Sequence, residues 1–274
     1  MYKTIVVHVD DSASMESRLQ AAAALAVAHG ARLVGVASTG LSLSAYARLA
    51  ALPALPPADE FEALRQGAQA SLARFAEGAR GLGVAATGQR LIEEESGHAL
   101  LLQSRYADLV VASQDGEEGA APHGMPAYVA LHGARPVLVV PPSWAGQPLD
   151  GQILVGWDGS LAATRAIDGA LPLLCRAGKV RLALVNPDRE SGLHGEEPGA
   201  DMALFLARHG VQVEVLAERT ALPVGEALLG MAHTCGAGLL VAGAFGHGRL
   251  REIVLGGVTR ILLERAPLPV LLAH

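Results

Sequence analysis

Aromatic residues and cysteines are scarce in this chain. Phe, Trp and Tyr together make up 4% of its 274 residues, and Cys175 and Cys235 are the only cysteines. Neither cysteine has a second Cys or a His at metal-ligand spacing, which argues against a disulfide scaffold and a structural zinc site. We therefore expect two core thiols in a protein of the reducing cytoplasm.

An excess of basic residues is also lacking. The net charge is −6, and the first 150 residues contain 10 Lys or Arg against 15 Asp or Glu. Binding to the phosphate backbone of DNA or RNA requires the opposite balance, so nucleic acid is not an expected partner. No run approaches the roughly 18 uncharged apolar residues of a membrane span, and the N-terminus lacks the features of a signal peptide. The sequence thus indicates a cytosolic protein that binds no membrane.

Small apolar residues, by contrast, are plentiful, and their pattern occurs twice. The sequences KTIVVHVDD (3–11) and QILVGWDG (152–159) are both apolar runs that end in Asp, and each is followed by a helical pattern. Similar pairs follow at a spacing of about 140 residues: ARLVGVAS (31–38) with KVRLALVN (179–186), ADLVVAS (107–113) with AGLLVAG (237–243), and ARPVLVVP (134–141) with APLPVLLAH (266–274). The chain is therefore a duplication of one unit.

Each copy alternates short apolar runs with longer helical patterns. This alternation predicts βαβ crossovers and an α/β fold, with five strands of a parallel sheet per copy and helices on both faces. The segment 141–151, rich in Pro and Gly, is the predicted linker. We predict an N-terminal domain over residues 1–145 and a C-terminal domain over residues 146–274.

One segment is longer than its counterpart in the second copy, which is the short polar stretch 186–200 and is expected to be an exposed loop. Residues 39–60, TGLSLSAYARLAALPALPPADE, predict a short amphipathic helix and a Pro-rich turn. Two roles are open: a packing element, which we favour, or a flap over a pocket.

The segment 241–263, VAGAFGHGRLREIVLGGVTRILL, contains the clearest binding motif. Its glycines let successive backbone N–H groups approach an anion, and the helix expected to start near its last two glycines favours negative charge at its N-terminus. Arg249 and Arg251 lie between the glycines and are candidates for charge-assisted contacts. In open parallel sheets, ligands bind at this edge, beyond the carboxyl ends of the strands. The segment therefore predicts a phosphate-binding loop.

The glycine spacing resembles the G-x2-G-x9-G-[Ser/Thr] signature of ATP-binding universal stress proteins. Gly243, Gly246 and Gly256 match it, and the ending VTRILLERAPLPVLL is also similar to the family. Gly257 departs from the signature, because the family has Ser or Thr there and its hydroxyl contacts phosphate. The resemblance implies the adenine nucleotide alpha-hydrolase-like fold with strand order 3-2-1-4-5, and ATP, ADP or AMP, with or without Mg²⁺, as the ligand.

The same resemblance implies the site residues. Asp158 would lie beside the ribose or adenine, although capping of the following helix is an alternative that can coexist with this role. Val185 would border the base. The phosphate-binding residues would be Gly243, Gly246, His247, Gly248, Arg249, Gly256, Gly257 and Val258. The alternative for His247 is that its side chain is exposed to solvent and does not contact phosphate.

The first copy lacks this loop. Its corresponding segment, 113–133, contains Asp115, Glu117 and Glu118, whose charges would repel a triphosphate, and two prolines without N–H donors. We predict that the first domain does not bind ATP and is structural or regulatory. His8 is expected to be a core or strand-end histidine, and Asp10 to cap the next helix.

The function that these features indicate is a stress-response protein in which an adenine nucleotide regulates association or the binding of another protein. Its expected partners beyond the nucleotide are a second copy of the chain and an unidentified regulatory protein. No nucleophile with an adjacent base is evident, so slow ATP hydrolysis is the most we expect. Two alternatives stay open: an ATP-dependent enzyme of the same superfamily, and an interaction module without nucleotide.

Overall fold

The computed structural model describes residues 1–50, 58–114, 124–188, 197–245 and 256–274. The described chain forms two compact units: the first is Tyr2–Arg135, and the second is Pro136–His274 together with Met1. The predicted domain boundary at 145/146 marks where the sequence repeats meet and stays a prediction. No described helix has the length and apolar character needed to cross a membrane.

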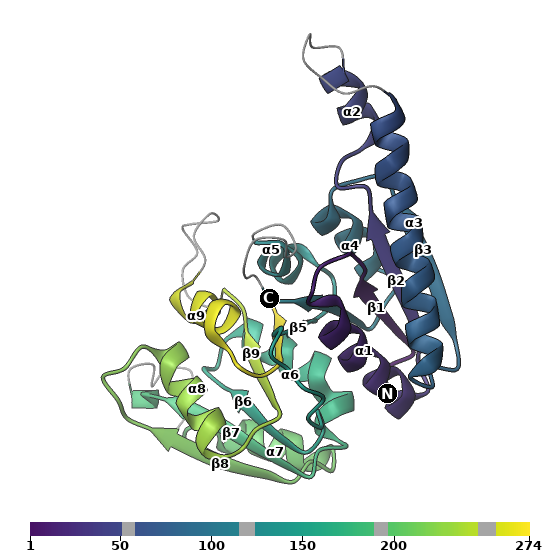
Figure 1. Cartoon of the computed structure of the whole chain (residues 1–274). Coiled ribbons are helices and arrows are strands. Elements are labelled where there is room, and N and C mark those ends of the chain that lie inside the picture. Colours follow the sequence, from purple (N-terminus) through teal and green to yellow (C-terminus); the bar gives the residue numbers. More distant parts are fainter. Residues whose placement is uncertain (51–57, 115–123, 189–196, 246–255) are drawn as a thin grey trace. The chain divides into compact units, whose positions relative to one another are not determined.

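The first unit is a parallel sheet with helices on both faces (Figure 1). Its elements are β1 (Thr4–His8), α1 (Met15–His29), β2 (Arg32–Ser38), α2 (Leu43–Ala50), α3 (Ala58–Gly81), β3 (Thr87–Ile92), α4 (Ser96–Ser104), β4 (Leu109–Ser113) and α5 (Met125–His132). The strand order is β3-β2-β1-β4, and the pairs are parallel. Because such crossovers are right-handed, α1 and α3 cover one face and α4 and α5 the other.

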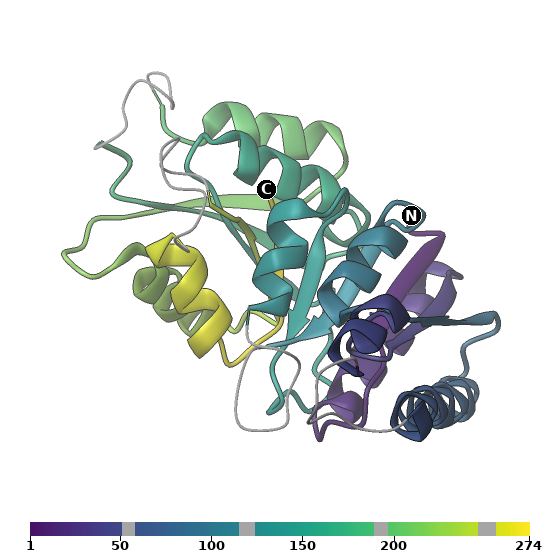
Figure 2. The same ribbon diagram turned by 90° about the horizontal axis from the view of Figure 1, so that it is seen from above.

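The second unit repeats this plan. Its elements are β5 (Val137–Val140), β6 (Gln152–Gly156), α6 (Leu161–Leu174), β7 (Lys179–Val185), α7 (Ala200–Arg208), β8 (Val213–Glu218), α8 (Val224–Thr234), β9 (Leu239–Gly243), α9 (Gly257–Arg265) and β10 (Val270–Ala273). Figure 2 shows its strands between α6 and α7 on one side and α8 and α9 on the other. The order β8-β7-β6-β9-β10 confirms the predicted 3-2-1-4-5 arrangement.

The fifth strand of the first repeat, β5, also pairs with a strand of the second repeat. β5 belongs to the second unit and pairs antiparallel with β10, with Val270 opposite Val139. Both strands consist of four buried residues. Their pairing satisfies backbone groups that an apolar edge strand would otherwise expose.

The predicted insertion helix is present as α2. Its Tyr46 packs on Phe61 of α3, with ring centroids 5.2 Å apart, and both side chains are buried. These contacts support the packing role of the insertion. The Pro-rich turn that we predict after α2 includes residues 51–57, which lie outside the described residues.

The expectation of two core thiols is wrong. Cys175 is exposed and Cys235 is half-buried. Both residues lie at helix C-caps, Cys175 after α6 and Cys235 after α8, where the apolar stripe of the helix has ended.

A glycine in β2 sets the closest approach of a helix to the first sheet. A Cβ on Gly35 would lie 2.5 Å from Cδ1 of Phe75, whose ring is buried under α3. We expect Gly35→Val to lower the free energy of unfolding by about 1–3 kcal/mol, because it overpacks this contact. Urea unfolding followed by circular dichroism measures the change.

The matched control is Gly67→Ala, also in the first unit. A Cβ on Gly67 meets nothing within 4 Å, and the residue lies inside α3. This change should leave stability equal or raise it by up to about 1 kcal/mol, since Ala favours the helix. Equal losses in both variants would contradict the packing account.

Candidate functional site

The second unit contains a pocket of about 350 Å³ at the carboxyl ends of its strands. The walls come from the ends of β6, β7 and β9, from α8, and from the start of α9. The described residues that line it are Gly156, Trp157, Asp158, Ala183, Leu184, Val185, Asn186, Val224, Leu228, Ala242, Gly243, Phe245, Gly256, Gly257, Val258 and Thr259. Its position is the one where open α/β sheets bind ligands.

Sequence reasoning found six of these residues, which come from four separate segments. The pocket brings together Asp158, Val185, Gly243, Gly256, Gly257 and Val258. Four further predicted residues, Gly246, His247, Gly248 and Arg249, lie outside the described residues.

Asp158 shapes the turn between β6 and α6. Its Oδ1 accepts a hydrogen bond from the backbone N–H of Ser160 at 2.9 Å. Ser160 is the N-cap of α6, and its Oγ accepts from the N–H of Ala163 at 3.1 Å. The alternative that Asp158 itself caps the helix is therefore wrong, because the serine two residues later takes that place. Asp158 is the only charged side chain among the described pocket residues.

Gly243 allows the end of β9 to approach α6. A Cβ at this position would lie 2.5 Å from the backbone N of Ala163. No larger residue fits without moving the helix. Gly243 therefore has a packing role in addition to lining the pocket.

The start of α9 faces the pocket with backbone groups. Gly256 is the N-cap without a side-chain cap, and Gly257 and Val258 form the first turn. The first N–H groups of a helix have no partner within it, and the helix dipole adds partial positive charge there. A Cβ on Gly257 would meet nothing within 4 Å. This end of the pocket is suited to an anionic group.

The part of the wall formed by β7 and α8 is apolar, and polar residues beside it connect the neighbouring loops. Val185, Val224 and Leu228 lie on β7 and α8. Asn186 follows β7 with a φ of 53°, and its side-chain amide bonds both the N–H and the C=O of Thr220. This pair joins the loops after β7 and β8 beside the pocket.

Sequence reasoning missed Thr259 and Phe245. Phe245 has a φ of 61°, which is strained for a residue with a side chain. Its backbone N–H donates to Oγ1 of Thr259 at 3.1 Å, and Thr259 is 2% exposed. The ring of His274 packs edge-on to Phe245, and its Nδ1 lies 2.9 Å from the Ala244 carbonyl oxygen. These contacts fix the first residues of the Gly-rich segment; a threonine one turn into the following helix was the available signal.

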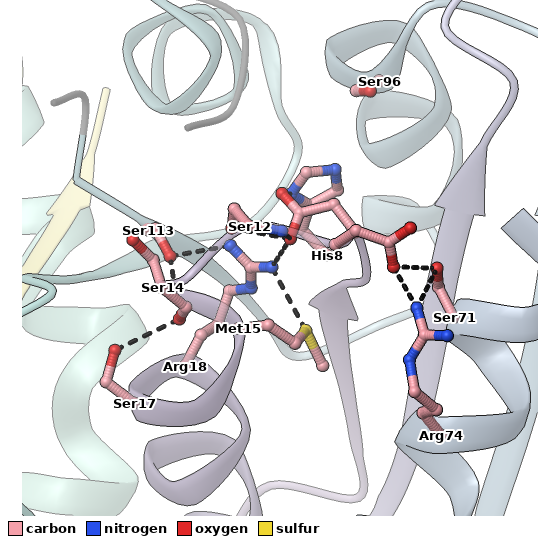
Figure 3. Close-up of polar contacts among 12 residues, drawn as sticks. His8, Ser12, Ser14, Met15, Ser17, Arg18, Ser71, Arg74, Ser96 and Ser113 are labelled. Carbon is pink, nitrogen blue, oxygen red and sulfur yellow. Dashed lines mark hydrogen bonds and ion pairs between the residues drawn. The ribbon is translucent and has the colours of Figure 1, made fainter. Parts of the chain in front are cut away.

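The first unit has a buried ion pair at the end of its first strand (Figure 3). Nη2 of Arg18, which is 0% exposed, lies 2.5 Å from Oδ1 of Asp10, and its Nη1 donates to Oγ of Ser113 at 2.7 Å. The same Asp10 oxygen accepts from Ser12, while Ser14 is the N-cap of α1. The prediction that Asp10 caps this helix is therefore wrong, for the reason found at Asp158.

His8 lies beside this pair and is buried, as expected for a core histidine. Its Nδ1 is 3.5 Å from Oδ2 of Asp10. Burial and the charge of Arg18 lower the pKa of His8 to about 4, against an opposing effect of Asp10. Burial acts to raise the pKa of Asp10, but the charges of Arg18 and His8 and the hydrogen bonds from Ser12 and Arg18 together outweigh it, and the pKa is lowered.

A metal site of protein ligands is not apparent in the described ranges, where no three His, Cys, Asp or Glu side chains come together. The charged loop predicted in the first copy, with Asp115, Glu117 and Glu118, lies outside the described residues.

Comparison with known proteins gives a family match over the second repeat. Residues 151–274 match the model of the Universal stress protein family. None of the curated proteins matches the chain in sequence.

Three solved structures illustrate the likeness in fold. A universal stress protein from Archaeoglobus fulgidus DSM 4304 is 17% identical, with a TM-score of 0.73 over 98% of this chain and 97% of that one. A putative universal stress protein from Pseudomonas aeruginosa UCBPP-PA14 is 15% identical, with a TM-score of 0.63 over 99% of this chain and 93% of that one. A universal stress protein in complex with cAMP is 23% identical, with a TM-score of 0.37 over 51% of this chain and 96% of that one. The first two show that the tandem fold extends over the whole chain.

The bond between Thr259 and Phe245 should contribute measurably to stability. We expect Thr259→Val to lower the free energy of unfolding by about 1–3 kcal/mol, because it leaves the Phe245 N–H without its acceptor. Urea unfolding of the full chain checks this. Thr259→Ser keeps the hydroxyl and should cost less than about 1 kcal/mol. If Thr259→Val loses no more stability than Thr259→Ser, the hydrogen bond to Phe245 does not contribute as proposed.

His8 should make the chain sensitive to acid. Its folded pKa of about 4 lies below the unfolded value near 6.5. The neutral His8 ring therefore makes its full contribution to the free energy of unfolding above pH 6.5. As the pH falls towards 4, the free energy of unfolding decreases by about 3 kcal/mol. Asp10 acts below this window, because its lowered pKa affects stability only below its ordinary range. Unfolding of wild type and His8→Gln between pH 7.5 and 4 isolates the effect; parallel curves would contradict it.

Proposed function

Because residues 151–274 match the Universal stress protein family, we propose that the second unit of this chain binds an adenine nucleotide in the pocket between β6, β7, β9 and α9. The ligand would be ATP, ADP or AMP, with Mg²⁺ accompanying the phosphates of ATP. Binding would regulate how this cytosolic stress-response protein associates with a second copy or with a regulatory protein.

The observation that carries the proposal is the convergence of predicted residues. Asp158 follows β6, Val185 ends β7, Gly243 ends β9 and Val258 lies in the first turn of α9, yet all four line one pocket. A purely structural glycine spacing would give no reason for Asp158 and Val185 to lie at the same cavity.

The pocket also offers the chemistry that the parts of a nucleotide require. The apolar wall of Val185, Val224 and Leu228 suits a base. The carboxylate of Asp158 is an acceptor for ribose hydroxyls. The first turn of α9 suits a phosphate, which Gly246, His247, Gly248 and Arg249 would also contact by family resemblance.

A binding role is supported better than an enzymatic one. Asp158 is the only ionisable side chain among the described pocket residues, and its proposed partner is the ribose. A general base for hydrolysis would have to come from elsewhere, so turnover of ATP should be slow. The solved complex of another universal stress protein with cAMP makes cAMP a useful fourth ligand to test.

The missing hydroxyl at Gly257 provides a gain-of-function test. We expect Gly257→Ser to bind ATP about three- to tenfold more tightly than wild type, because it adds one hydrogen bond to phosphate. Space is available, since a Cβ there meets nothing within 4 Å. Isothermal titration of the full chain with ATP, ADP, AMP and cAMP, with and without Mg²⁺, measures the affinities.

Two variants control this experiment. Gly257→Ala adds the Cβ without the hydroxyl and should bind as wild type does. Asp158→Asn keeps an oxygen for the Ser160 N–H but removes the charge, and should bind about tenfold more weakly. The absence of binding heat, together with no nucleotide in natively purified protein, would reject the proposal in favour of a nucleotide-free module.

A further inference from the structure

The sheet registers align the two repeats residue by residue. Ile5 of β1 lies opposite Leu109 of β4, and Ile153 of β6 lies opposite Leu239 of β9. Counting from these pairs places His8 at the position of Gly156, and Ser113 at the position of Gly243. The positions of the two pocket glycines of the second repeat therefore carry side chains in the first repeat.

His8 fills the space that Gly156 leaves open. A Cβ on Gly156 would lie 3.3 and 3.4 Å from the two Cδ atoms of Leu228, so a side chain at this position extends towards the helix α8. In the first unit, the matching residue of α4 is the fully buried Leu100. His8 is only 3% exposed, whereas Gly156 lines a pocket. The imidazole ring is thus enclosed by protein at the place where the second unit has a cavity.

A hydrogen bond closes the matching gap between strand and helix. Ser38 ends β2 as Val185 ends β7, and Ser96 begins α4 as Val224 begins α8. The two serine Oγ atoms lie 2.7 Å apart. The two valines line the pocket of the second unit. The hydroxyl pair therefore joins β2 to α4, and a nucleotide base would have to enter between these two elements.

Arg18 stabilises the same end of the first unit. Asp10 and the N-cap Ser14 are separated by two residues more than Asp158 and Ser160 are. Arg18 occupies the room under this longer turn, where it contacts both Asp10 and Ser113. Asp11, in the same turn, accepts a hydrogen bond from Ser71 and pairs with Arg74 of α3. The carboxylate that matches Asp158 is therefore already bound to a buried cation.

We propose that the first unit is a closed copy of the pocket, so that the chain binds one nucleotide, and that the residue ending the first strand of each repeat decides between closed and open. His8 closes the first copy and Gly156 keeps the second open. The inference rests on the proposed function of the second unit and extends it to stoichiometry and to the residue that sets it.

The direct test is to place the histidine of the first unit at the matching position of the second, Gly156. Wild type should bind one ATP per chain in isothermal titration, and Gly156→His should bind at least 100-fold more weakly. Gly230→His on α8 is the matched control, since it adds the same side chain where a Cβ meets nothing within 4 Å and where the residue does not line the pocket, so affinity should stay within about threefold. Circular dichroism and urea unfolding verify that both variants are folded. Two ATP per chain, or unchanged affinity in Gly156→His, would overturn the proposal.

A second measurement needs no nucleotide. The ring signals of His8, assigned in ¹H–¹⁵N spectra by comparison with His8→Gln, should not titrate between pH 7.5 and 5, because the ring is enclosed beside Arg18 and Asp10. Titration near the ordinary value of about 6.5 would show an open ring and overturn the closed copy. If wild type binds no nucleotide, the proposed function fails, and this measurement alone decides whether the first copy is closed.

Discussion

The pocket of the second unit depends on the absence of side chains at the ends of its central strands. Gly243 lets α6 pack directly on β9, and Gly156 leaves the space between β6 and α8 open. The carboxyl ends of parallel strands lie at one edge of the sheet. The side chains there therefore decide whether this edge is open to a ligand or filled by the protein itself. At the matching positions of the first repeat, the described side chains of His8 and Ser113 are buried.

Two features of the chain are energetically unfavourable by themselves and are stabilised by local contacts. Burial of Arg18 is unfavourable unless its charge is paired, and Asp10 and Ser113 provide that pairing. Phe245 adopts a left-handed backbone, and Thr259 holds its N–H in place. The first cost belongs to the first unit, where His8 and Ser113 are buried beside the ion pair. The second lies at the edge of a pocket, where strain often accompanies a binding function.

Periodicity was sufficient to predict the duplicated α/β architecture, because short apolar runs and amphipathic helices are properties of local sequence. The pairing of β5 with β10 was not predictable in this way, since VLVV and VLLA carry no information about which edge they join. Asp158 and Ser160 are both good N-cap residues, and only backbone geometry distinguishes them. The role of Thr259 was not predictable from the sequence, because it depends on a loop residue 14 positions earlier. The exposed positions of the cysteines reflect helix ends, which sequence defines only approximately.

The pairing of β5 with β10 separates the repeat in the sequence from the folding unit in space. A fragment cut at the linker, as the repeat suggests, would begin after β5 and leave one edge of β10 without its hydrogen-bonding partner. Exposed apolar edges recruit other strands, so such a fragment would be prone to self-association. The end of the first repeat in the sequence is therefore not the end of a folding unit: the second unit includes the last strand of the first repeat.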